Sequence, residues 1–185
     1  MSELQTLIEG YKKRSRNHGV KRNDESYKQC LEFTKSELER LLKMYEGMIE
    51  EDMTARLMRD SIDHHIRRYH DYAVKGKIGS HYREVGVIES QSIFEHVIPA
   101  SSVRDMLIEG RISINQALNT PTCLIKKSQD IKLTENGLSK TSPNNWNFFQ
   151  RYRVLDSQFT THIGTPITNL DTWSLEDHHN YFHIN

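Results

Sequence analysis

The fold is decided within residues 62–99, IDHHIRRYHDYAVKGKIGSHYREVGVIESQSIFEHVIP. The first part of this stretch has apolar residues at helical spacing, whereas the part after residue 82 has short β-branched and aromatic runs. Gly76 and Gly79 stand at the change. Helical sequence followed by short strands predicts an α+β fold, in which an N-terminal helical region of residues 1–80 precedes a small mixed module.

The helical region contains two candidate stretches. Residues 2–17 have apolar side chains at helical spacing and Ser2 as an N-cap. A second stretch runs from about Asp24 to about Lys75 without proline, and its weak point at Gly47 predicts a break or kink near residues 47–54. So long a stretch needs a packing partner: the first helix, its own second half in a hairpin, or another subunit. A homodimer through the N-terminal helices is therefore one expected assembly.

Residues 81–160 are expected to form the small module, and residues 161–185 a loop-rich C-terminal tail. Within the module, β-prone runs occur at residues 85–88, 94–98 and 122–125, and helical segments at residues 101–109 and 112–118.

Composition and the absence of common motifs argue against several classes of protein. Hydrophobic residues make up 36% and charged residues 27%, which allows a modest core. No apolar run approaches the roughly 20 residues that span a bilayer, so we expect no membrane partner and a cytoplasmic location. Cys30 and Cys123 are too far apart in sequence for a CxxC site, which argues against a cysteine-based zinc site. Phosphate-loop, dinucleotide and nucleophile-elbow motifs are absent, which argues against nucleotide-dependent and acyl-transfer enzymes.

The formal net charge of zero is unevenly distributed. Residues 11–22 hold six cations and no acid, whereas the last thirty residues hold four acids and no Lys or Arg. Such asymmetry suits a protein that meets a polyanion on one face, although solvated surface charge is the alternative. The candidate nucleic-acid-binding residues are Lys126, Lys127, Arg151, Arg153, Arg67 and Arg68.

The segment Phe94-Glu95-His96-Val97-Ile98-Pro99 contains the residue types of a hydrolytic site. A neutral imidazole with a pKa near ~6.5 can take a proton from water at physiological pH. Oxygen ligands such as Glu95 and Asp130 suit Mg²⁺ or Mn²⁺. Neighbouring residues of a regular strand point to opposite faces, so a site shared by Glu95 and His96 requires a strand end or bend.

This segment resembles the first half of the HNH (ββα-metal, His-Me finger) nuclease motif, in which an acid-His pair ends a strand. Residues 118–133, LNTPTCLIKKSQDIKL, resemble the second half, in which an Asn precedes an apolar run and a helix with the final metal ligand. The resemblance covers about residues 85–155. It departs from the family in having Asp130 where His is commoner, no flanking cysteines, and a helical insert of some twenty residues between the halves.

The resemblance implies a metal-dependent DNA endonuclease. His96 would be the general base, Glu95 and Asp130 would hold Mg²⁺ or Mn²⁺, and Asn119 would orient the His96 loop. As a small stand-alone nuclease, the chain would also be similar to bacteriophage enzymes that degrade host DNA, such as the endonuclease IV group. These enzymes act in the host cytoplasm. Two alternatives stay open: a ribonuclease that uses the same residues, and a non-enzymatic helical nucleic-acid or protein binder.

A C-terminal group of His178, His179 and His183 is expected to be fortuitous as a metal site, because a flexible end holds ligands poorly.

Overall fold

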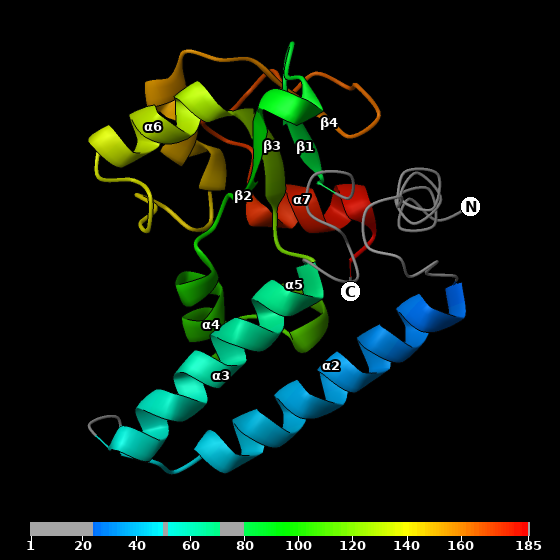
Figure 1. Cartoon of the computed structure of the whole chain (residues 1–185), viewed down its shortest axis with the longest axis vertical. Coiled ribbons are helices and arrows are strands. Elements are labelled where there is room, and N and C mark those ends of the chain that lie inside the picture. Colours follow the sequence, from blue (N-terminus) through cyan, green and yellow to red (C-terminus); the bar gives the residue numbers. More distant parts are fainter. Residues whose placement is uncertain (1–23, 50–51, 71–79, 185) are drawn as a thin grey trace.

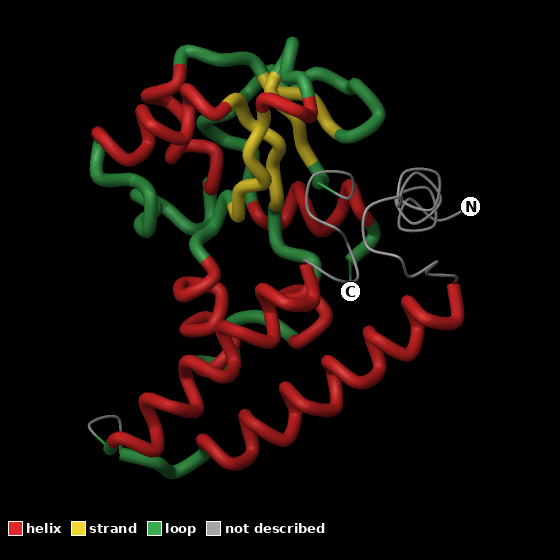
Figure 2. Tube along the Cα trace, in the orientation of Figure 1, coloured by secondary structure: helices red, strands yellow, loops and turns green. Residues whose placement is uncertain are grey.

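The structure, a computed structural model, describes residues 24–49, 52–70 and 80–184. Its α-helices are α2 (Asp24–Tyr45), α3 (Met53–Tyr69), α4 (Ala100–Ile108), α5 (Ile114–Leu118), α6 (Lys127–Glu135) and α7 (Leu175–Phe182). Two 3₁₀ helices, η2 (Glu89–Gln91) and η3 (Phe148–Leu155), accompany the strands β1 (Tyr82–Glu84), β2 (Ser92–His96), β3 (Thr122–Lys126) and β4 (Phe159–Thr161). Helices around one small sheet confirm the predicted α+β class (Figure 2). The helix expected at residues 2–17 lies outside the described residues.

Helices α2 and α3 form a hairpin, seen at the bottom of Figure 1. The chain breaks between them at Gly47, whose φ of 78° is in the left-handed region that glycine adopts without strain. The break predicted near residues 47–54 is therefore confirmed, as is the hairpin among the expected packing arrangements. Leu38 and Leu41 of α2 and Ile62 of α3 are buried within the chain. Dimerisation is not required to cover these side chains, and the homodimer stays a prediction.

The sheet has the strand order β2-β3-β1-β4. Strand β3 pairs antiparallel with β2 and parallel with β1, while β4 pairs antiparallel with β1. Two of the expected strands are present, at residues 92–96 and 122–126. The strand expected at residues 85–88 is wrong: β1 covers residues 82–84, and the chain turns at Gly86, whose φ is 73°. Strand β4 was not predicted, because three residues are too few to show a pattern.

Helices α4 and α5 connect β2 to β3 and lie between the sheet and the α2–α3 hairpin (Figure 1). Both helices were predicted. Helix α5 begins with a reciprocal cap, in which the Ser113 hydroxyl accepts from the Gln116 backbone N–H and the Gln116 side chain accepts from the Ser113 backbone N–H. Gly110, with φ of 70°, follows α4 and reverses the chain. The helical insert expected between the two halves of the motif is thus present.

One continuous hydrophobic core joins the helical hairpin, the connecting helices and the sheet. It includes Leu38 and Ile62 of the helical hairpin together with Leu118, Phe149 and Leu175 from the rest of the chain. The expectation of a loop-rich tail is wrong for residues 175–182, which form α7. A reciprocal Ser174–Asp177 cap begins this helix. No helix of the described ranges has the length and apolar character needed to cross a membrane.

Candidate active site

Glu95 and His96 are the last two residues of β2. Their Cα partners across the antiparallel ladder are Cys123 and Thr122, so the strand remains regular to its end. The two side chains therefore point to opposite faces of the sheet. The chain leaves the sheet only afterwards, at Pro99, which precedes the first turn of α4. The bend needed to bring both side chains into one site is absent at the pair itself.

Arg151 of η3 forms an ion pair with the carboxylate of Glu95. One guanidinium nitrogen lies 2.5 Å from a Glu95 carboxylate oxygen, and the two side chains are 1% and 15% exposed, respectively. The remaining N–H groups of Arg151 donate to four backbone carbonyls, those of His96, Val97, Leu138 and Ser139. A guanidinium that is this deeply buried and this fully bonded has no surface to offer a phosphate. The prediction that Arg151 binds nucleic acid is therefore corrected: it connects η3 to the end of β2.

Burial has the largest effect on the pKa of the Glu95 carboxyl. It raises the pKa of this carboxyl, the Arg151 charge opposes the rise, and the nearby negative charge of Asp130 adds to it. Asp130 is half-buried in the first turn of α6. The two predicted metal ligands are thus close enough for the charge of Asp130 to affect the pKa of Glu95.

These carboxylates do not fit a divalent-metal site. A metal ion on Glu95 would approach the Arg151 guanidinium, and the two cations would repel each other in a poorly solvated environment. His96 is on the other face of the strand. Among the side chains of residues 24–49, 52–70 and 80–184, no group of three or more His, Cys, Asp or Glu residues is arranged to hold a metal ion. The expected Mg²⁺ or Mn²⁺ would therefore have to bind through fewer than three of these side chains in the described part of the chain, and it stays a prediction.

His96 belongs to a hydrogen-bonded chain of two imidazoles. Its Nε2 lies 2.8 Å from Nδ1 of His70, the residue that follows α3, and Nε2 of His70 lies 2.9 Å from the Leu118 carbonyl oxygen. Burial lowers the pKa of His70 to about 4 and that of His96 well below the usual range, and the Arg67 charge lowers both further. Both rings are therefore neutral at physiological pH. His96 is partly exposed, whereas His70 is fully buried.

Asn119 caps the C-terminus of α5. Its side-chain amide donates to the backbone carbonyl of Asn115 at 2.8 Å, and its own carbonyl accepts from Nε2 of His178 at 2.8 Å. Neither contact reaches His96. The described contacts thus assign Asn119 to the end of the helix and give no support to its expected role in orienting the His96 loop.

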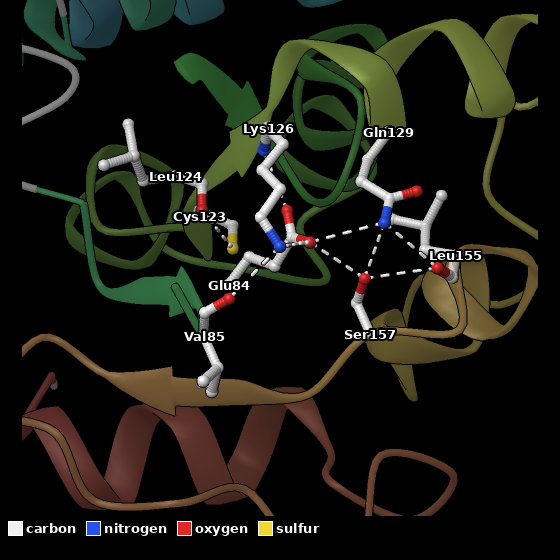
Figure 3. Close-up of polar contacts among 8 residues, drawn as sticks. All are labelled: Glu84, Val85, Cys123, Leu124, Lys126, Gln129, Leu155 and Ser157. Atoms are coloured by element: carbon white, nitrogen blue, oxygen red, sulfur yellow. Dashed lines mark hydrogen bonds and ion pairs between the residues drawn. The ribbon is translucent and has the colours of Figure 1, made fainter. Parts of the chain in front are cut away.

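The remaining predicted cations differ in their surroundings. Lys126 lies 2.9 Å from the buried Glu84 carboxylate, which also accepts from Gln129 and Ser157 (Figure 3). Burial opposes ionisation of Glu84, yet these hydrogen bonds prevail and lower its pKa. Arg67 pairs with Asp63 and Arg153 with Asp171, both on the surface. Lys127 and Arg68 are exposed, and Arg67 and Arg153 are about half-exposed within their ion pairs, so these four are the predicted cations best placed to meet a polyanion.

Three histidines that were not predicted to be buried, His70, His81 and His178, are buried in the structure. His178 of α7 is fully buried between the Asn119 carbonyl and the Tyr82 hydroxyl, 2.8 Å from each, so the C-terminal histidines do not all lie on a flexible end. His70 is also fully buried. A signal for its burial existed, because His70 follows Ile62 and Ile66 at intervals of four residues and therefore continues the apolar stripe of α3.

Comparison of the chain with protein-family models, with curated proteins and with solved structures found no match.

Proposed function

We propose that the chain is a nuclease that hydrolyses phosphodiester bonds in DNA, with His96 as the general base. The observation that carries the proposal is the environment of this imidazole: it ends a strand, is partly exposed, and is held in its neutral form. Its Nε2 is engaged by His70, and Nδ1 has no hydrogen-bond partner among the described residues. A neutral ring with an unoccupied nitrogen lone pair is the form that accepts a proton from a nucleophile.

The arrangement around His96 supports the same proposal. Strand β2 ends with the Glu95-His96 pair, β3 pairs antiparallel with it, and α6 follows directly and packs against both strands. This strand–strand–helix order is the one that the HNH resemblance implies, with Asp130 on the helix. Helices α4 and α5 take the place of the short connection between the strands.

In the proposed reaction, Nδ1 of His96 takes a proton from a water molecule while the water oxygen bonds to phosphorus. The bond from phosphorus to one nucleoside oxygen breaks, and that oxygen takes a proton from solvent. The proton on His96 then returns to solvent, which restores the neutral ring. Arg67 is half-exposed and lies one helical turn before His70, so we assign it to the phosphate, which would take the place of Asp63 as its partner.

A second candidate substrate is RNA, and one observation favours it. The described residues assemble no group of three metal donors. In RNA, the neighbouring 2′-hydroxyl can serve as the nucleophile, so a base alone can start the reaction. His96 would then take the hydroxyl proton while the 2′-oxygen bonds to phosphorus and the bond to the 5′-oxygen breaks. The 5′-oxygen takes a proton from solvent, and His96 returns its proton to solvent. The product would carry a 2′,3′-cyclic phosphate, whereas water attack on DNA gives a linear phosphate end.

The test is incubation of the purified protein with plasmid DNA, single-stranded DNA and RNA, each with Mg²⁺, with Mn²⁺ and with EDTA. We expect cleavage by the wild type and none by His96→Ala. The matched control is His64→Ala, which removes an exposed histidine of α3 and should leave cleavage unchanged. The EDTA arm tests the predicted metal requirement, and the cyclic phosphate identifies the RNA reaction. Undiminished cleavage by His96→Ala, or none by the wild type on any substrate, refutes the proposal, and the second result leaves a non-enzymatic binder.

A further inference from the structure

The hydrogen bonds from His96 through His70 to α5 determine where each proton lies. The Leu118 carbonyl oxygen carries no proton and only accepts, so Nε2 of His70 carries a hydrogen and donates at 2.9 Å. A neutral imidazole has one N–H group, which leaves Nδ1 of His70 with its lone pair. The 2.8 Å contact between this Nδ1 and Nε2 of His96 therefore takes its hydrogen from His96. In neutral His96, the lone pair is consequently on Nδ1.

The fold holds this chain of contacts firmly. His70 continues the buried stripe of α3 and is fully buried, with its ring 5.9 Å from that of Tyr69. The last carbonyls of an α-helix lack partners within the helix, and α5 ends at Leu118. His70 takes the carbonyl of Leu118, and His178 takes that of the next residue, Asn119. Two imidazoles, one directly after α3 and one in α7, thus donate to consecutive carbonyls, which fixes the position of His70 relative to the end of the sheet.

We propose that His70 is the positioning residue for His96: it selects the Nε2–H tautomer and orients the ring so that Nδ1 receives the proton of the nucleophile. The catalytic part of this inference rests on the proposed nuclease function, whereas the tautomer does not. When Nδ1 of His96 gains the proton, the Nε2–H bond to His70 becomes charge-assisted and stronger. An aspartate performs the corresponding task in a serine-protease triad, where loss of the correct tautomer lowers the rate greatly. Here the acceptor is a neutral ring.

The direct test is the tautomer of His96, read from ¹⁵N–¹H correlation spectra of the imidazole rings in protein labelled with ¹⁵N-histidine, near pH 7.5. We expect the wild type to show a protonated Nε2 and an unprotonated Nδ1 at His96. His70→Asn offers an amide oxygen at the branch position of Nδ1 and should retain this tautomer. His70→Leu removes the acceptor and should give a mixture of tautomers. The control His162→Leu removes a partly buried imidazole whose ring contact is with Phe182, and it should leave the His96 tautomer unchanged.

Cleavage assays on the same proteins test the consequence. We expect His70→Leu to lose about 10- to 100-fold in turnover, by analogy with loss of the hydrogen-bond partner of a metal-bound histidine, with a smaller change in KM. His70→Asn should recover most of this loss. A wild-type His96 protonated on Nδ1 overturns the inference, as does a His70→Leu protein with unchanged tautomer and turnover. If His70→Leu does not fold, the wild type and His70→Asn still decide the tautomer. The expected tautomers without cleavage of DNA or RNA by the wild type would refute the nuclease function and leave the tautomer assignment intact.

Discussion

Mild acid should destabilise this protein through its buried neutral histidines. The pKa is lowered by burial to about 4 at His70 and to about 3 at His178, and well below the usual range at His81. In the unfolded chain each of these side chains titrates near ~6.5. Between the unfolded and the folded pKa, the unfolded state therefore binds more protons. The free energy of unfolding is fully retained above about pH 6.5 and falls progressively as the pH drops toward the folded values.

The size of the effect follows from the lowered pKa values of His70 and His178. At pH 5, protonation stabilises an unfolded histidine by about 2 kcal/mol, while folded His70 and His178 remain almost entirely neutral. These two residues alone should remove about 4 kcal/mol from the free energy of unfolding between pH 7.5 and pH 5. The total for a domain is roughly 5–15 kcal/mol, so a large share of the stability should be lost. His81 adds to the loss in the same direction.

The assay is urea unfolding at several pH values between 7.5 and 4.5, followed by tryptophan fluorescence. His178→Gln is the informative variant, because its amide can still donate to the Asn119 carbonyl and accept from the Tyr82 hydroxyl without titrating. We expect this variant to reduce the slope of stability against pH near pH 5 by one proton, or about 1.4 kcal/mol per pH unit. Equal slopes in the wild type and His178→Gln, or a wild-type stability that stays constant down to pH 5, would refute the reasoning.

Three further predictions concern single side chains. Arg151→Ala should cost about 3–5 kcal/mol in urea unfolding, because it leaves the Glu95 carboxylate without its partner; an effect below about 1 kcal/mol would contradict the buried ion pair. Lys127→Ala should lower the salt slope of DNA binding by about 0.9, the value for one phosphate contact, whereas Lys43→Ala on α2 should not; equal slopes would remove Lys127 from the interface. Ser174→Ala should lower stability by about 1 kcal/mol through loss of the α7 cap, and no change in the unfolding midpoint would show that the cap contributes nothing.

Local signals in the sequence were sufficient for most of the helices. The break at Gly47, the Ser113 cap and the stop at Gly110 each depend on neighbours within a few residues, and all three are present in the structure. The cap of α7 is just as local, since Ser174 stands three residues before Asp177, and reading it would have shown that the tail contains a helix. The extent of β1 was misjudged because β-propensity describes the surroundings of a strand more than its backbone.

The surroundings of the candidate site were harder to predict, because they depend on partners distant in sequence. Arg151 resembles any surface arginine until the carbonyls of residues 96 and 97 and the Glu95 carboxylate are placed around it. His96 was identified from its neighbours in sequence, but its partner His70 lies 26 residues away on another element. A helical pattern can show that His70 is buried. It cannot show that a second imidazole and the end of α5 lie beside it.

The polar contacts also explain why the helical hairpin and the sheet should act as one unit. Three other parts of the chain meet at the end of β2. His70, directly after α3, contacts the His96 ring and the Leu118 carbonyl at the end of α5, and Arg151 of η3 donates to the His96 carbonyl. Buried polar groups are costly unless each is bonded, so displacement of any one element would leave carbonyls or ring nitrogens unsatisfied. The position of His96 is therefore determined as much by the helices that surround the motif as by the motif. Variation in α3 should affect the site even where no residue of α3 touches the substrate.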